Sequence, residues 1–245
     1  MGIKDLVDLY TYEVLSQQLD QYGYLKPEGV LDLFNQAAVR QASEHDLGFE
    51  VLIKENLIWI MLRQKVELVN NVYTPKVIKL KTWPLKPNKF EYFRDFSLYD
   101  ENDVLLYKGS SVWCLFNLNT NFMELKNKKY FAGNFIAEAP QINIKKLSFV
   151  YDESFEKVIT FTILKSYLDK NRHTNNARYI QMVYDSSKFD YFNDFQIEYI
   201  KQTFLGQKID IFRKDISANC EYFVGKADNN IIFKACVNGV INENK

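Results

Sequence analysis

Residues 169–176 read Asp169-Lys170-Asn171-Arg172-His173-Thr174-Asn175-Asn176, which places an acid, an imidazole and several amides side by side. The stretch follows a strand-like run over residues 158–167 and precedes a helix-like run that begins near Ala177. A polar loop between a strand and a helix is held by rigid elements on both sides, and such loops often carry functional side chains. The order strand, polar loop, helix therefore indicates both the fold and a candidate site.

The same order of elements occurs earlier in the chain. A short strand over residues 10–16 and a polar loop over 20–24 precede apolar residues that recur at helical spacing through 30–42. Strand-like runs follow each predicted helix, at 57–69, 76–83, 90–99 and 104–118 after the first and at 195–203, 207–214, 217–225 and 230–240 after the second.

The two halves also share local sequence. Residues 66–68 ahead of 73–75 resemble residues 197–199 ahead of 204–206, at similar spacing. A repeat of this length predicts duplication of a domain of about 120 residues. We therefore expect an N-terminal domain over residues 1–125, a linker over 126–150 and a C-terminal domain over 151–245.

The composition excludes several classes of protein. The 31 basic and 31 acidic residues cancel, so nothing favours nucleic-acid binding. Glycine is scarce and the three cysteines have no C-x-x-C spacing, which predicts no cofactor and no metal. No apolar run is long enough for a membrane span or a signal peptide, so a cytoplasmic location is expected. The aromatic content of 16% favours strands.

A strand, an apolar helix and four or five antiparallel strands form the pattern of a hotdog fold, in which a curved sheet wraps a central helix. Two such copies predict an α+β chain with a tandem (double) hotdog. The alternative is an unrelated α+β protein whose halves are similar by chance.

The central loop carries a family resemblance. Asp169-x-Asn171-x-His173-x-Asn175-Asn176-x-x-Tyr179-Ile180 resembles the signature of acyl-acyl carrier protein thioesterases of the plant and bacterial type. The resemblance extends to Leu25-Lys26-Pro27 with Gln36-Ala37-Ala38, to Trp83-Pro84 with Arg94-Asp95-Phe96, and to Ile197-Glu198-Tyr199. It implies a double hotdog that hydrolyses the thioester of fatty acyl chains on acyl carrier protein and releases free fatty acid.

Thioester hydrolysis needs an activated water and a stabilised oxyanion. His173 suits a general base, because the unperturbed pKa of imidazole, about 6.5, lies near working pH. Asn171 can donate an amide N–H to the carbonyl oxygen or position the water. Asp169 can orient an imidazole or amide, or alternatively attack as a nucleophile to form an anhydride.

One position departs from the family. In the plant members, the strand after the second helix brings a glutamate, followed by a cysteine, to the site; a gap-free alignment puts Gln202 and Thr203 there. Glutamine can orient a water but cannot take its proton, so the base role shifts onto His173. Glu198 is an alternative acid, because strand alternation would place it on the same face as Gln202.

Further residues are predicted to bind substrate. Asn175 is expected to cap the following helix and to adjoin the substrate, Arg172 to meet the acidic carrier, and Trp59 to form part of an acyl-pocket wall. The other histidine, His45, is expected at the end of the first helix, without a catalytic role. The first half lacks an Asp-x-Asn-x-His loop, so we expect one active site per chain, in a monomer (a pseudo-dimer of hotdogs) or a homodimer.

Two other functions are compatible with the sequence. The chain could hydrolyse acyl-coenzyme A rather than acyl carrier protein, or it could bind acyl chains without catalysis. The complete set of Asp169, Asn171 and His173 argues against the non-catalytic alternative, whereas Gln202 in place of the family glutamate favours it.

Overall fold

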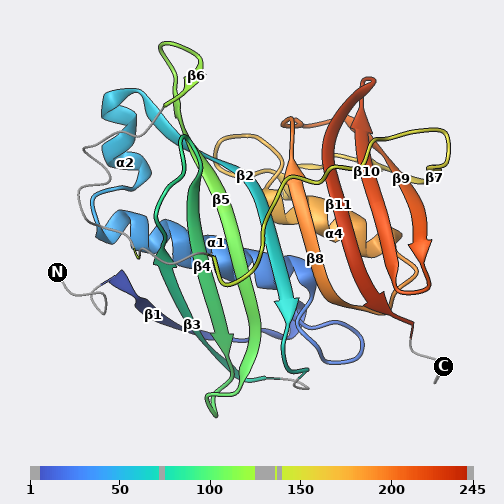
Figure 1. The fold of residues 1–245 in the computed structure, drawn as a ribbon, viewed down its shortest axis with the longest axis horizontal. Coiled ribbons are helices and arrows are strands. Elements are labelled where there is room, and N and C mark those ends of the chain that lie inside the picture. The colour runs from blue at the N-terminus through green and yellow to red at the C-terminus, as the bar shows by residue number, and fades with distance from the viewer. Residues whose placement is uncertain (1–5, 72–74, 125–135, 137–139, 242–245) are drawn as a thin grey trace. The chain divides into compact units, whose positions relative to one another are not determined.

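The fold was examined in a computed structural model, which describes residues 6–71, 75–124, 136 and 140–241 (Figure 1). The chain divides into two compact units, residues 1–144 and 145–245. The division falls within the stretch that the sequence predicts to be a linker.

The N-terminal unit has a row of five antiparallel strands with one long helix packed on it. Its sheet has the order β1-β3-β4-β5-β2, and α1 lies along one face of it (Figure 1). The elements are β1 (Asp8–Glu13), η2 (Ser16–Gln18), α1 (Pro27–Glu44), α2 (Phe49–Leu52), η3 (Ile53–Glu55), β2 (Leu57–Leu68), β3 (Val77–Pro84), β4 (Tyr92–Tyr99), β5 (Leu105–Asn117) and β6 (Phe122–Met123), which pairs with β5.

The C-terminal unit repeats this plan. Its sheet has the order β7-β9-β10-β11-β8, with α4 along one face (Figure 1). In both units the first strand lies at an edge beside the third, and the helix follows the first strand, so the predicted duplication is confirmed in the topology. The elements are β7 (Glu156–Thr162), η4 (Lys165–Tyr167), α4 (Asn176–Ser186), β8 (Tyr191–Tyr199), β9 (Lys208–Ser217), β10 (Cys220–Ala227) and β11 (Asn230–Val240).

Close contact between helix and sheet sets the core of the N-terminal unit. Pro27 occupies the first turn of α1, where its missing N–H costs nothing. The ring of Phe34, on the apolar face of α1, stacks on Phe96 of β4 with ring centroids 4.4 Å apart. Gly109 of β5 lies beneath the same ring, and a Cβ at that position would come within 2.1 Å of it. Only glycine lets the helix approach the sheet this closely.

The C-terminal unit packs its helix in a similar way. Tyr179 of α4 lies against Phe233 of β11, with ring centroids 5.4 Å apart. Phe233 in turn covers Gly225 of β10, where a Cβ would come within 2.1 Å of the ring. Each unit thus has an antiparallel sheet packed against one helix, and the expected hotdog fold is confirmed.

The described end of the predicted linker is extended and hydrogen-bonded to strands. In the N-terminal unit, the backbone N–H of Gln141 donates to the buried carboxylate of Asp95 in β4 (2.8 Å). In the C-terminal unit, the backbone N–H of Leu147 donates to the carboxylate of Glu198 in β8 (3.1 Å). The Glu198 carboxylate therefore already has a structural partner outside the 169–176 loop.

The end of β8 differs from the prediction of a strand over residues 195–203. The N–H groups of Ile200 and Lys201 both donate to the carbonyl of Ile232, at 2.8 and 3.0 Å, and this shared acceptor ends the ladder with β11. Gln202 and Thr203 consequently lie in the loop after β8. Strand alternation, the reason for placing Glu198 and Gln202 on one face, does not extend that far.

The two halves end this strand in the same way. In the N-terminal unit, the N–H groups of Val69 and Asn70 both donate to the carbonyl of Leu106, at 2.8 and 3.2 Å. Residues 66–68 of β2 therefore correspond to residues 197–199 of β8, as the shared local sequence predicts.

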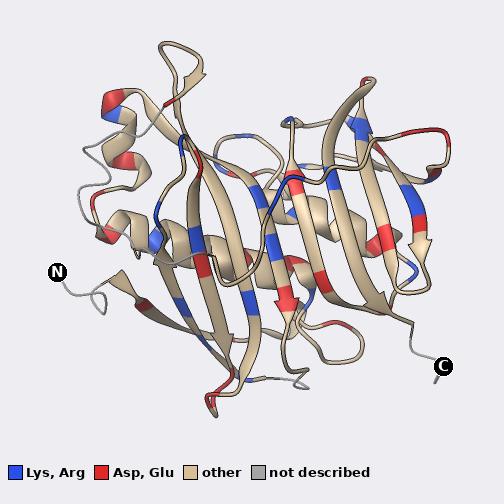
Figure 2. Ribbon diagram, in the orientation of Figure 1, with Lys and Arg blue, Asp and Glu red and all other residues tan. Residues whose placement is uncertain are grey.

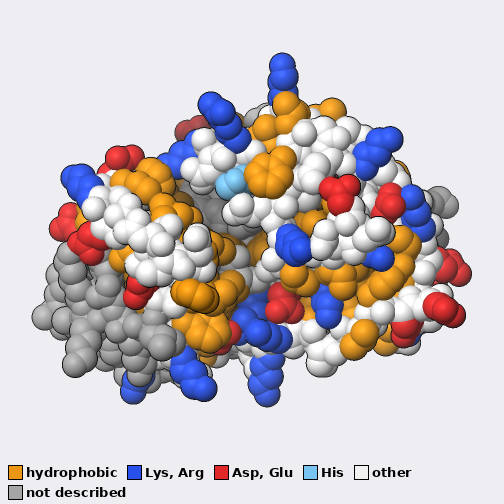
Figure 3. Space-filling model, turned by 90° about the horizontal axis from the view of Figure 1, so that it is seen from above, with side chains coloured by type: hydrophobic (Ala, Val, Ile, Leu, Met, Phe, Trp, Pro, Cys, Tyr) orange, Lys and Arg blue, Asp and Glu red, His pale blue; other side chains and the backbone are white. Residues whose placement is uncertain are grey.

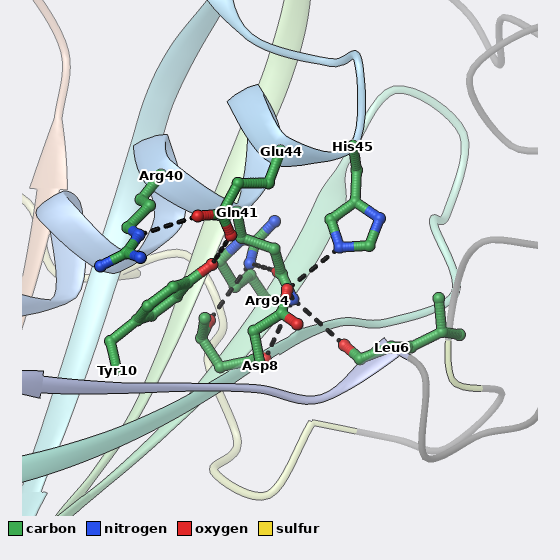
Figure 4. Close-up of polar contacts among 9 residues, drawn as sticks. Leu6, Asp8, Tyr10, Arg40, Gln41, Glu44, His45 and Arg94 are labelled. Atoms are coloured by element: carbon green, nitrogen blue, oxygen red, sulfur yellow. Dashed lines mark hydrogen bonds and ion pairs between the residues drawn. The ribbon is translucent and has the colours of Figure 1, made fainter.

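A buried amide ties α1 to the strands of the N-terminal unit (Figure 4). Gln41 is 2% exposed, and its Nε2 donates to the Asp8 carboxylate (2.7 Å) and to the carbonyls of Leu6 (3.1 Å) and Thr82 (3.2 Å). Its Oε1 accepts from the guanidinium of Arg94, which also donates to the Thr82 hydroxyl (3.1 Å). Burial lowers the pKa of Arg94 to about 10.

The end of α1 adds charged contacts around this amide (Figure 4). The Tyr10 hydroxyl donates to Glu44 (2.6 Å), which also receives the Arg40 guanidinium (2.8 Å). His45 caps the C-terminus of α1, as expected, and its Nε2 lies 3.0 Å from the Asp8 carboxylate. Burial, and then the bond to Glu44, raise the pKa of the Tyr10 hydroxyl above its ordinary value.

We predict that Gln41→Ala destabilises the protein by about 3 kcal/mol, because it leaves the Arg94 guanidinium and three acceptors without their partner. Gln36→Ala, an exposed change on the same helix, serves as the control and is expected to stay within about 0.5 kcal/mol of wild type. Urea unfolding followed by circular dichroism measures both. Equal losses in the two variants would contradict the assigned role of Gln41.

Candidate functional site

The backbone of the 169–176 loop is fixed by the first residue of the predicted motif. One carboxylate oxygen of Asp169 accepts the N–H of Asn171 (2.8 Å) and the N–H of His173 (3.2 Å). The Asp169 N–H in turn donates to the His173 carbonyl (2.8 Å), and a β-bridge joins Leu168 to Thr174 at the base of the loop. These bonds set the positions from which the side chains of Asn171 and His173 extend.

The last part of the loop starts the helix. Asn175 is the N-cap of α4, and its side-chain oxygen accepts the N–H of Ala177 (2.9 Å), as the sequence predicts. Arg172 lies at the corner of the loop with φ of 65°, a left-handed conformation that costs a non-glycine residue about 1–2 kcal/mol. Its side chain is exposed.

A buried cluster of three hydroxyls, those of Thr174, Tyr179 and Thr203, joins this loop to the loop after β8. The N–H of Thr174 donates to the carbonyl of Thr203 (2.9 Å), and the two threonine hydroxyls lie 2.8 Å apart. The Tyr179 hydroxyl lies 2.9 Å from the Thr203 hydroxyl and accepts the Thr203 N–H (3.2 Å). Thr203 is 0% exposed, and burial raises the pKa of Tyr179. Thr203, which the gap-free alignment places at the cysteine of the plant members, thus has a structural role in this cluster.

The hydroxyl cluster places the loop after β8 beside His173. Phe204, the residue after Thr203, packs edge-on against the imidazole with ring centroids 5.2 Å apart. Gln202, the residue before Thr203, is exposed, as is Asn171, whereas His173 is partly buried. The structure therefore gathers Asp169, Asn171 and His173 on one loop and places Gln202 on the loop that is bonded to it.

Sequence reasoning missed the side chains that make this junction. The sequence does not single out Thr174 or Phe204, and it gives Tyr179 no role beyond its place in the motif. Tyr179 belongs to the predicted motif, and that was the available signal for its hydrogen bonds. Nothing in the sequence pairs Thr174 with Thr203, because the bond depends on where β8 ends.

Trp59 lies in the N-terminal unit, on β2, within a core cluster that includes Leu52 and Tyr92. Its indole N–H donates to the carbonyl of Leu47 (3.0 Å), and its ring meets that of Tyr92 edge-on, with centroids 5.0 Å apart. These contacts account for the burial of Trp59 as core packing, and its place in an acyl-pocket wall stays a prediction.

The N-terminal unit contains a copy of the candidate loop with different side chains. One Asp20 oxygen accepts the N–H groups of Tyr22 (2.8 Å) and Tyr24 (2.9 Å), and a β-bridge joins Leu19 to Leu25. Gly23 takes the left-handed corner, with φ of 83°. The backbone bonds match those of residues 168–174, but tyrosines stand where the C-terminal loop has Asn171 and His173.

This copy bears on the role of Asp169. Asp20 makes the same two backbone bonds in a loop that has no histidine. The bonds of Asp169 therefore shape the loop whether or not a histidine is present. The sequence predicts that this carboxylate orients an imidazole or an amide, whereas its hydrogen bonds in the structure run to backbone N–H groups.

Two further searches gave no site within the described residues. Among them, no group of three or more His, Cys, Asp and Glu side chains is arranged to hold a metal ion. None of the described helices is long and apolar enough to span a membrane.

Both units match family models. The model described as the acyl-ACP thioesterase N-terminal domain matches residues 7–128, and that of the acyl-ACP thioesterase C-terminal domain matches residues 151–236. The chain belongs to the acyl-ACP thioesterase family. The candidate loop lies in the C-terminal domain of this family, and its tyrosine-bearing copy lies in the N-terminal domain.

Curated members of the acyl-ACP thioesterase family match part of the chain. An acyl-[acyl-carrier-protein] hydrolase of Cuphea viscosissima chloroplasts is 28% identical over 144 residues, which are 56% of this chain and 35% of the relative. A palmitoyl-acyl carrier protein thioesterase of Arabidopsis thaliana chloroplasts matches with the same identity and the same coverage. The matched segment thus spans about a third of the length of these relatives.

Solved structures of acyl-ACP thioesterases match nearly the whole chain. One from Bacteroides thetaiotaomicron is 21% identical with a TM-score of 0.89, covering 97% of this chain and 99% of that one. The 12:0-ACP thioesterase of Umbellularia californica is 18% identical with a TM-score of 0.85, covering 97% and 98%. At these identities the likeness establishes the fold.

We predict that Asp169→Ala destabilises the protein by about 1–2 kcal/mol, whereas Asp169→Asn costs much less, because an amide oxygen accepts the same two N–H groups. Asp20→Ala and Asp20→Asn form the matched pair in the N-terminal loop and should show the same order. Urea unfolding measures all four variants. An asparagine variant as unstable as its alanine counterpart would contradict the role of either carboxylate as a backbone acceptor.

Proposed function

We propose that the chain is a thioester hydrolase that releases free fatty acid from acyl-acyl carrier protein, with its reaction centre at the 169–176 loop. The observation that carries this proposal is the pinned loop of the C-terminal family domain, in which Asp169 sets the backbone of Asn171 and His173. The printed names of the relatives, which are acyl-carrier-protein hydrolases and thioesterases, supply the substrate class.

His173 is the general base of this proposal. Its imidazole is partly exposed and is packed edge-on against Phe204, so the ring has a defined neighbour while one side stays open to solvent. The imidazole takes a proton from a water whose oxygen attacks the thioester carbonyl carbon. The tetrahedral intermediate then expels the thiolate, which recovers the proton from the imidazolium, and the products are a free acid and a thiol.

Asn171 and the start of α4 serve the oxyanion. Asn171 is exposed two residues before His173 on the pinned loop, and its amide N–H groups can donate to the carbonyl oxygen as negative charge develops there. The side-chain oxygen of Asn175 is engaged by the helix cap, which leaves its NH₂ group as the donor for substrate. The positive end of the α4 dipole adds to the field on this side.

Gln202 is assigned to orienting the water. It is exposed beside Thr203, whose carbonyl is bonded to the N–H of Thr174, the residue that follows His173. A glutamine amide can hold a water by accepting or donating a hydrogen bond, but it cannot take the proton. His173 therefore carries the proton transfer alone.

Replacing the base tests the reaction. We predict that His173→Ala lowers kcat/KM for acyl-acyl carrier protein by about 10²–10⁴-fold, the usual contribution of a general base. His45→Ala removes the other histidine, which caps α1 in the N-terminal unit, and serves as the control with activity near wild type. Release of free fatty acid is measured at fixed acyl chain length. Full activity in His173→Ala would refute the assignment of the base.

A substitution at Gln202 tests whether this side chain contacts the attacking water. We predict that Gln202→Glu raises kcat severalfold, up to about tenfold, because a carboxylate at this position can share the proton transfer with His173. Gln36→Glu, at an exposed position of α1 in the N-terminal unit, makes the same change in charge away from the candidate site and is the control. The same acyl chain is compared on carrier protein and on coenzyme A. An unchanged or lower kcat in Gln202→Glu would show that this side chain does not meet the attacking water.

A further inference from the structure

The two segments that build the candidate site carry an excess of positive charge. Residues 163–178 and 200–208 together contain six lysines and arginines and one acid, Asp169, although the whole chain has a net charge of zero. Over both sheets, by contrast, acidic and basic residues are mixed (Figure 2). The six basic residues are Lys165, Lys170, Arg172, Arg178, Lys201 and Lys208.

The N-terminal copy shows that the fold itself does not require this charge. The N–H of Ile163 donates to the carbonyl of Gln207, as that of Val14 does to Lys76, so residues 14–29 and 69–77 are the corresponding segments. These segments contain two basic and two acidic residues. The corresponding segments are thus neutral in one unit and strongly basic in the other, beside His173.

Three of these lysines lie close along the chain to exposed apolar side chains. Leu164, Phe204 and Leu205 are 52%, 49% and 52% exposed. Leu164 adjoins the loop of the other two, because the N–H of Gly206 donates to the carbonyl of Ile163 (2.9 Å). Leu15, the counterpart of Leu164 in the N-terminal unit, is also 52% exposed, so the charge distinguishes the two copies. Apolar and basic side chains lie side by side on the face that Figure 3 views.

The basic residues near these apolar side chains are Lys165, Lys201 and Lys208. Lys165 follows Leu164 directly, and Lys208 pairs with Thr162 where β9 begins. Lys201 lies two residues before Thr203, and its ammonium donates to the side chain of Asn230 (2.6 Å). Asn230 is neutral, so this contact does not cancel the charge of Lys201. All three lysines are exposed. The surface is defined by these three lysines together with Leu164, Phe204 and Leu205.

We infer that this surface docks the acidic carrier protein that presents the acyl thioester, an inference that rests on the proposed function. Lysines beside a few exposed apolar side chains complement a partner with carboxylates beside a small apolar patch. Phe204 belongs to this surface and also packs against His173. A carrier protein bound here would therefore hold its acyl thioester beside the general base. An anionic membrane is the less suitable partner, because three apolar side chains on fixed loops offer little surface for insertion.

The experiment compares two triple charge reversals. Lys165→Glu/Lys201→Glu/Lys208→Glu alters the surface, and Lys54→Glu/Lys145→Glu/Lys146→Glu makes the same change in net charge at exposed lysines elsewhere. Each is assayed with one acyl chain on carrier protein and on N-acetylcysteamine, a small uncharged thiol. Binding of the carrier protein without an acyl chain is measured by titration calorimetry, and binding to phosphatidylserine vesicles by sedimentation.

The surface variant should lose about 10- to 100-fold in kcat/KM for the carrier substrate, mainly through KM, and should lose carrier binding to a similar extent. Its activity on the N-acetylcysteamine thioester should stay within about twofold of wild type, and the control variant should keep both activities. Added salt should weaken the carrier reaction of wild type more than that of the surface variant.

Several results would overturn the inference. Equal losses on both thioesters would place the lysines in the reaction centre or the fold, and equal losses in the control variant would show a general charge effect. Loss of vesicle binding with unchanged carrier kinetics would assign the surface to a membrane. If wild type hydrolyses neither thioester, the proposed function fails; carrier binding that only the surface variant loses would still support the docking surface, and binding unchanged in that variant would refute it.

Discussion

Two hydrogen bonds from backbone N–H groups to one Asp169 oxygen define the geometry on which the candidate site depends. They turn the chain between η4 and α4, and Asn171 and His173 extend from the resulting hydrogen-bonded loop. Asp20 repeats the arrangement in the other unit, with tyrosines at the positions of Asn171 and His173. The carboxylate is therefore a structural acceptor in both units, and the two loops differ in the side chains that they carry.

The second constraint is the buried junction between this loop and the loop after β8. Hydroxyls in an apolar interior require partners, and Thr174, Thr203 and Tyr179 satisfy one another there. Phe204, which follows Thr203, packs against the imidazole of His173. Gln202 precedes Thr203 and is exposed. A threonine at the position of the family cysteine is consistent with this use, because its hydroxyl completes the cluster.

Much of the fold could be predicted from the sequence, since the helical spacing around Phe34 and the repeated order of strands are local patterns that the core enforces. Helix capping by Asn175 and the position of His45 were predictable for the same reason. The end of β8 was not, because it depends on a carbonyl, that of Ile232, which accepts two N–H groups. The contacts of Gln41 with Arg94 and of Thr174 with Thr203 join residues far apart in sequence, and no periodicity reveals them.

The two copies of the loop differ in the residue at the left-handed corner, and therefore in the steric cost of the turn. Gly23 adopts the left-handed conformation without a steric cost, whereas Arg172 holds the same corner against its intrinsic preference. The N-terminal loop thus has the backbone of the candidate loop without strain at its corner, and it carries Tyr22 and Tyr24 at the positions of Asn171 and His173. Exchanging side chains on the N-terminal loop would need no change of its backbone, whereas the C-terminal loop keeps an arginine at its corner despite the steric cost.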